Sequence, residues 1–141
     1  MIKKIFLSFF FLFILSKGGL FAKTEYFQQG IKLYQDNKLD EAKFKFEQDI
    51  VLNPKSELSY LFLSKIFNKQ AKNNLEEQNL NAVILLNPNN EEAIYYLTKL
   101  KLNNSDYEKS KQLNKRLKLI CSNFCDKSDK LKIEIENLSK K

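Results

Sequence analysis

One short pattern occurs twice in this chain of 141 residues, beginning first at Ile50 and again at Ile84. The letters IVLNP occupy residues 50–54, and ILLNP occupies residues 84–88. In both copies an aliphatic run leads into Asn-Pro, and proline cannot continue a helix. The chain has only three Gly and two Pro, which leaves little material for the turns of a many-stranded sheet. The sequence therefore predicts a repeated helical unit with a fixed period.

Small residues keep the same period. Gly30, Ser64 and Thr98 follow one another at the interval that separates the two copies, and Ala42 and Ser110 are separated by two such intervals. Small side chains at such places let two helices approach closely. A 34-residue period with these features resembles the tetratricopeptide repeat, in which each unit is a helix, a tight turn and a second helix. The resemblance implies an all-α, right-handed superhelix of three helix-turn-helix units over residues 23–56, 57–90 and 91–122.

The second and third units depart from the repeat pattern. Glu76 stands where a small residue is usual, Asn73 and Asn74 replace an apolar turn residue, and Ser122 replaces the terminal proline. These departures affect local packing and leave the period intact.

The repeat register predicts where each helix lies. The expected first helices are Glu25–Gln35, Glu57–Lys69 and Glu91–Lys101, and the expected second helices are Leu39–Leu52, Leu75–Leu86 and Tyr107–Ile120. Within residues 123–141, a last helix is expected over Asp126–Ser139, because Leu131, Ile135 and Leu138 form one apolar stripe. An array of repeats needs such a terminal element, apolar inside and polar outside, and we expect this helix to cap it.

Residues 1–22 have the layout of a secretory signal peptide. A basic start at Lys3 and Lys4 precedes a nearly continuous apolar run over residues 5–15, and Ala22 is the expected last residue before cleavage. A membrane-spanning helix needs about 20 apolar residues, and Lys17 interrupts this run earlier. We therefore expect export to the periplasm or envelope of a bacterium; retention of the segment as an N-terminal anchor is the alternative.

Positive charge is concentrated at the C-terminal end. Without residues 1–22 the formal charge falls from +7 to +4, while residues 99–141 alone carry +6. A basic region can attract anionic lipid, so a membrane-surface protein is the alternative function. For an exported chain of this modest charge, nucleic-acid binding is not expected.

The resemblance implies that the first helices line a concave face that binds a segment of another protein. A gradient from aromatic to Lys- and Asn-rich side chains along this face suits a partner with an apolar anchor and acidic or amide-bearing neighbours. A competing interpretation places Phe27, Ile31 and Leu61 in the core between repeats, because apolar stripes normally face inward. The candidate partner-binding residues are Phe27, Tyr34, Lys65, Asn68, Lys69, Tyr95, Lys99 and Asn103.

Some tetratricopeptide domains hold a C-terminal carboxylate with Lys, Asn and Arg side chains at fixed places. In this sequence those places hold Phe27, Ile31, Phe62, Glu92 and Tyr96. Binding of cytosolic chaperone tails is therefore not expected.

Cys121 and Cys125 are the two cysteines of the chain. An exported protein meets oxidising conditions, so we expect a structural disulfide that joins the third unit to the last helix. A redox-active pair is the less favoured alternative, because two intervening residues, not three, are usual there.

An enzyme is not expected. The chain contains no His, the commonest general base and metal ligand. The acidic pairs, such as Glu76-Glu77 and Glu91-Glu92, fall where helix starts or solvated faces are expected. No cofactor or metal site is predicted, and the sequence favours a non-enzymatic interaction scaffold. Three units are about the minimum for a stable array, so self-association is a further expectation.

Overall fold

The computed structural model describes residues 24–140. The signal segment predicted over residues 1–22 lies outside them. Over the described residues the chain forms α-helices joined by short turns, with no strand. The helices are α2 (Glu25–Gln35), α3 (Leu39–Leu52), α4 (Glu57–Lys69), α5 (Asn73–Leu86), α6 (Glu91–Asn103), α7 (Tyr107–Ile120) and α8 (Cys125–Leu138). None of these helices is long and apolar enough to cross a membrane.

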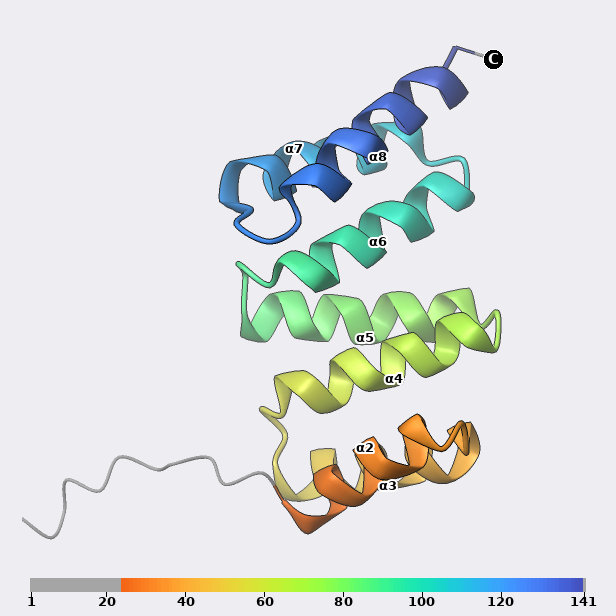
Figure 1. The fold of residues 1–141 in the computed structure, drawn as a ribbon, viewed down its shortest axis with the longest axis vertical. Helices are drawn as coiled ribbons and strands as arrows, with labels where there is room; N and C mark the ends of the chain where they lie inside the picture. The colour runs from red at the N-terminus through yellow and green to blue at the C-terminus, as the bar shows by residue number, and fades with distance from the viewer. Residues whose placement is uncertain (1–23, 141) are drawn as a thin grey trace, which may run out of the picture.

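The helices pair in chain order. Helix α2 packs on α3, α4 on α5 and α6 on α7, and each pair also packs on the next. Figure 1 shows the pairs stacked along the long axis, with α2 and α3 at one end and α8 at the other. Helix α8 covers the last pair through contacts with α7 and α6. The predicted right-handed superhelix of three helical hairpins with a capping helix is confirmed.

The turn inside each hairpin has the same geometry in all three units. Asn37, Ala71 and Ser105, which are one repeat period apart, have φ angles of 57°, 53° and 61°. Just after each, a backbone amide donates back to the preceding helix, as Lys72 N does to Phe67 O at 2.9 Å. This left-handed residue ends the first helix and turns the chain toward the start of the second helix.

Small residues permit close packing within each hairpin. Gly30, Ser64 and Thr98 are buried at the contact between paired helices. At Gly30 the approach is closest, because an added Cβ would lie 2.8 Å from Phe46 Cε1. The Phe46 ring stacks on Phe62 with centroids 4.9 Å apart. One apolar cluster fills the first half of the array around these rings, and a second, built on α4 to α7, fills the other half.

Four predicted helices, α2, α3, α4 and α7, have the expected bounds, and the other three differ slightly. Helix α5 begins at Asn73, two residues early, because the turn at Ala71 determines where it starts. Helix α6 continues to Asn103, and Leu102 in this last turn packs with Leu131 and Ile135 of α8. Helix α8 spans Cys125–Leu138, one residue earlier than expected at each end.

Candidate functional site

Four of the predicted partner-binding residues line one pocket. Tyr34 comes from α2, and Lys65, Asn68 and Lys69 come from α4. The pocket has a volume of about 210 Å³, and its remaining lining residues are Ser64, Glu76 and Tyr96. It therefore lies where the first helices of the three units face one another, with a single contribution from the second helix of the middle unit.

Glu76 is the deepest charged group of this pocket. It sits in the first turn of α5 and is 1% exposed. The Asn68 amide Nδ2 donates to both of its carboxylate oxygens at 3.1 Å. Burial raises the pKa of Glu76, and the hydrogen bond from Asn68 opposes this change in part. Of the two places expected for the acidic pairs, Glu76 occupies a helix start and does not lie on a solvated face.

Lysines and tyrosines form the rim of the pocket. Lys65 Nζ pairs with Glu92 Oε1 at 2.8 Å. Lys69 Nζ lies 4.6 Å from the centre of the Tyr34 ring, within the range of a cation–π contact. Burial, followed by the nearby Glu92 carboxylate, raises the pKa of Tyr96. At neutral pH Tyr96 therefore offers a neutral ring to the pocket.

The prediction that Phe27 lines the binding face is wrong. Its side chain is 2% exposed and belongs to the first core cluster, with its ring 5.9 Å from that of Phe46 and 6.2 Å from that of Phe62. Leu61 is 4% exposed and lies in the second cluster. The competing interpretation, that apolar residues of the first helices are core, holds for both residues. Their helical spacing does not distinguish the two roles.

The three candidates on α6 do not line the pocket. The Tyr95 ring packs against Phe124, with centroids 5.5 Å apart, at the start of α8. Lys127 and Lys99 place their ammonium groups 5.3 Å and 5.9 Å from the centre of the Tyr95 ring. Asn103 is exposed in the last turn of α6. Because α8 packs on α6, the part of the predicted face around Tyr95 is occupied by the chain itself, whereas Lys99 and Asn103 are exposed.

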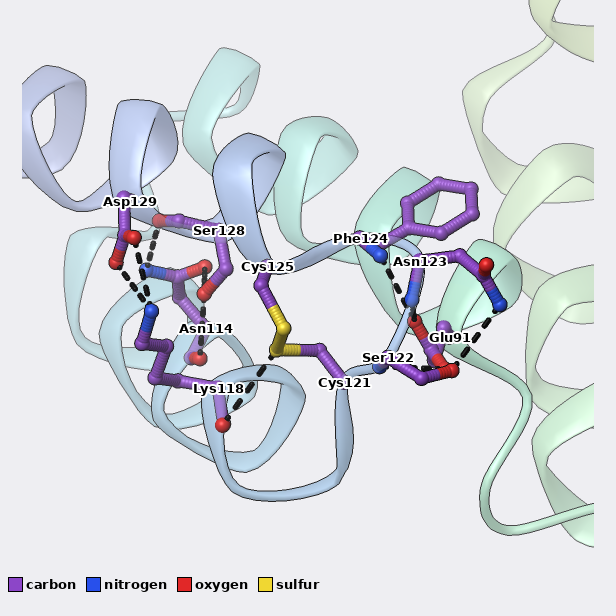
Figure 2. Close-up of a disulfide and its surroundings, with 10 residues drawn as sticks. All are labelled: Glu91, Asn114, Lys118, Cys121, Ser122, Asn123, Phe124, Cys125, Ser128 and Asp129. Carbon is purple, nitrogen blue, oxygen red and sulfur yellow. Dashed lines mark hydrogen bonds and ion pairs between the residues drawn. A yellow bond between two sulfur atoms is a disulfide. The ribbon is translucent and has the colours of Figure 1, made fainter.

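The cysteine pair lies in the short link between α7 and α8. The structure joins Cys121 and Cys125 by a disulfide, shown in Figure 2. Beside it the Glu91 carboxylate accepts hydrogen bonds from the backbone amides of Ser122, Asn123 and Phe124, each at 2.9 Å. The Ser122 hydroxyl donates a further bond at 2.7 Å. These four bonds, with that of the hydroxyl the largest cause, lower the pKa of Glu91 to about 2.

A second hollow of about 350 Å³ lies between α7 and α8. Lys111, Lys115, Lys118 and Lys132 stand around it, and Lys118 is paired with Asp129 at 2.8 Å. Leu119 at its edge is 79% exposed. Of the hollows described here, this one brings together the largest number of basic side chains. Among residues 24–140, no group of three His, Cys, Asp or Glu side chains could hold a metal ion.

No protein-family model matches this sequence, and no curated protein does either. Solved structures do share its fold. The TPR2B domain of yeast Sti1, solved in complex with pHsp70, has a TM-score of 0.74 at 13% identity, over 80% of this chain and 94% of that one. The Yersinia enterocolitica type III secretion chaperone SycD, in complex with a peptide of the translocator YopD, has a TM-score of 0.72 at 13% identity, over 82% of this chain and 90% of that one. The first TPR domain of Spaghetti (RPAP3), bound to an HSP90 peptide, has a TM-score of 0.69 at 17% identity, over 82% of this chain and 88% of that one.

These likenesses establish the fold. Over its described residues the chain has the architecture of tetratricopeptide-repeat domains.

Proposed function

We propose that this chain is a non-enzymatic interaction module of the bacterial cell envelope that binds an extended segment of another protein. The observation that carries the proposal is the pocket where α2, α4, α5 and α6 meet. It brings together two aromatic rings, an amide and charged groups of both signs in a concave place. Such a mixture gives a bound segment apolar contact area and fixes its register through polar contacts.

Three structural neighbours support peptide binding as the role of such a face. The Sti1 domain is in complex with pHsp70, SycD with a YopD peptide, and the RPAP3 domain with an HSP90 peptide. The five places that hold a terminal carboxylate in some of these domains differ here, so we propose an internal segment as the ligand. Export is supported by the signal layout of residues 1–22, and the Cys121–Cys125 disulfide suits an oxidising compartment.

A displayed library of random 12-residue peptides, screened against the full chain purified from an exporting host, tests the binding function. Selected peptides are then titrated against the wild type, Tyr34→Ala and the matched control Tyr26→Ala. Tyr26 is also on α2 and also has a lysine over its ring, Lys45 at 5.2 Å, but it does not line the pocket. We expect Tyr34→Ala to weaken binding at least tenfold, equivalent to about 1.4 kcal/mol, and Tyr26→Ala to leave it unchanged.

Two results would contradict the proposal. The first is a screen that enriches no peptide. The second is a set of peptides that bind Tyr34→Ala as tightly as the wild type. The envelope role has its own test, because a C-terminal reporter enzyme that needs disulfides would stay inactive if the chain remained in the cytoplasm.

The lysine-rich hollow between α7 and α8 favours a second candidate function, attachment to anionic lipid. Four lysines there surround the exposed aliphatic side chain of Leu119. Co-sedimentation of the full chain with phosphatidylglycerol vesicles, and with phosphatidylcholine vesicles as the control, tests this. Attachment through lysines should weaken sharply between low salt and 0.5 M salt. Equal sedimentation with both vesicles at both salt concentrations would exclude it.

A further inference from the structure

The buried carboxylate of Glu76 is held by a neutral group. Its hydrogen-bond donor is the Asn68 amide. The two lysines of the pocket interact with other groups, since Lys65 pairs with Glu92 at 2.8 Å and Lys69 lies over the Tyr34 ring. In the described part of the chain, no lysine or arginine forms an ion pair with Glu76. An ionised carboxylate out of water is costly unless a cation or several donors compensate it.

The two other repeats show that the fold does not need an acid at this place. Ala42 and Ser110 occupy the equivalent position, one period before and one period after Glu76, and both are 0% exposed. There the small side chains fill the contact between the paired helices. In the middle repeat the longer Glu76 reaches beyond that contact to line the pocket. Its carboxylate is therefore dispensable for packing, yet it lies where a ligand would enter.

The pocket wall already attracts a cation. The ammonium group of Lys69 lies 4.6 Å from the centre of the Tyr34 ring, and Lys69 itself is exposed. Aromatic faces bind ammonium and guanidinium groups in this way. Tyr96 lines the pocket as well, and its ring is neutral at neutral pH. Because Lys69 can return to solvent at little cost, another cation can replace it on the ring.

We infer that this pocket takes a lysine or arginine side chain of the partner segment, which pairs its cationic group with Glu76 and lays its stem against Tyr34 and Tyr96. This inference rests on the proposed function and identifies the residue that the pocket selects. An acidic side chain, the neighbour expected from the sequence, would instead lie against the Glu76 carboxylate in a place shielded from water. Like charges so placed repel, whereas a cation supplies the missing partner.

Two substitutions have opposite expected effects. Glu76→Gln removes the negative charge but keeps the size of the side chain and an oxygen for the Asn68 amide. We expect it to weaken binding of a basic peptide at least tenfold. Lys69→Gln removes the resident cation from the Tyr34 ring, and we expect it to tighten the same binding about threefold. If the pocket selects acidic side chains, both effects reverse in sign.

The probes are 12-residue peptide libraries with random flanks and one fixed central residue. The fixed residue is lysine, arginine, glutamate or norleucine, which has a hydrocarbon chain like that of lysine without the ammonium. Each library is titrated by fluorescence polarisation against the full chain and its variants. Matched controls are Glu77→Gln, which changes the adjacent acid paired with Lys101, and Lys72→Gln, which changes an exposed lysine just before α5. Circular dichroism and the melting temperature verify that Glu76→Gln is folded.

The inference requires that the lysine and arginine libraries bind at least tenfold more tightly than the norleucine and glutamate libraries, and that only Glu76→Gln abolishes the difference. Tightest binding by the glutamate or norleucine library would overturn it while leaving peptide binding on this face intact. The same holds if the lysine library binds Glu76→Gln as well as it binds the wild type. If no library binds the wild type, the proposed function itself fails.

Discussion

Substitution of Gly30 by alanine tests the close packing of α2 on α3. Two effects of opposite sign compete at this position: the higher helix propensity of alanine stabilises the fold, and the added methyl group clashes with Phe46. A Cβ added to Gly30 would lie 2.8 Å from Phe46 Cε1 and 2.9 Å from Phe46 Cδ1. Protein atoms do not approach this closely, so the Phe46 ring or the backbone must move. The ring has little room to do so, since it is 0% exposed, stacked 4.9 Å from Phe62 and packed beside Phe27.

The balance of these effects gives the expected magnitude. Alanine is favoured over glycine in a helix interior by about 1 kcal/mol. An extra methyl group in a well-packed core costs about 1 to 3 kcal/mol. With the clash near the middle of that range, we expect Gly30→Ala to lower the free energy of unfolding by about 1 kcal/mol. For a chain of this size the melting temperature would then fall by about 4 °C.

Urea unfolding of a double-mutant cycle separates the two effects. In Phe46→Leu the ring is absent, so Gly30→Ala in that background should stabilise the protein by about 1 kcal/mol through helix propensity alone. The coupling between the two positions should therefore be about 2 kcal/mol. If Gly30→Ala stabilises the wild type, or if the coupling is below about 0.5 kcal/mol, the contact between Gly30 and Phe46 does not limit the packing of α2 on α3.

Three further outcomes follow from the same structure. Ala71→Gly should raise the free energy of unfolding by about 1 kcal/mol, because alanine is disfavoured at a φ of 53°. Ala82→Gly is the control inside α5 and should lower the free energy of unfolding by a similar amount. Urea unfolding measures both changes. The Glu91 carboxylate has a pKa lowered from its ordinary value of 4.5 to about 2. Its ionised form therefore stabilises the fold above pH 4.5, and this stabilisation is lost as the pH falls from 4.5 to about 2. The wild type should therefore lose more stability than Glu91→Gln between pH 5 and pH 2, and equal losses would contradict the role of its four hydrogen bonds. Burial raises the pKa of Glu76, so ionisation of this group costs stability as the pH rises. Glu76→Gln should therefore be more stable than the wild type at pH 7, and the difference should shrink toward pH 4. Equal stability of the two proteins at pH 7 would contradict this.

The repeat period predicted more of the fold than the hydrophobic pattern did. Helices α3, α5 and α7 begin at Leu39, Asn73 and Tyr107, which are one period apart. The expected start of α5 at Leu75 lies two residues after this register. Asn73 is polar, but the left-handed residue Ala71, two positions earlier, fixes the direction of the chain, as Asn37 and Ser105 do in the other two turns. The same register gives the end of α6 at Asn103, since α4 ends at Lys69.

The candidate site could be predicted only in part, because side chains at equivalent repeat positions have different neighbours. Tyr34, Lys65, Asn68 and Lys69 fall in one pocket as their positions on α2 and α4 indicate. Lys99 and Asn103 lie on α6 one repeat period after Lys65 and Lys69, but they do not line the pocket. Tyr95 of the same helix packs against Phe124 at the start of the capping helix, and no periodic pattern describes a helix that occurs once. The sequence shows that Glu76 replaces a small residue. Its burial depends on the facing helices and appears only in the structure.

The position of Glu76 separates the packing requirement of the array from the requirement of the proposed site. A repeated architecture fixes most buried positions by packing, and here Ala42 and Ser110 satisfy that requirement. An acid at the equivalent place in the middle repeat places a desolvated charge in the pocket, where its hydrogen-bond donor is a neutral amide. Natural sequences depart from local consistency mainly at functional or strained sites. The proposed recognition of a cation by the middle repeat accounts for both the departure of this residue from the repeat pattern and its place in the pocket.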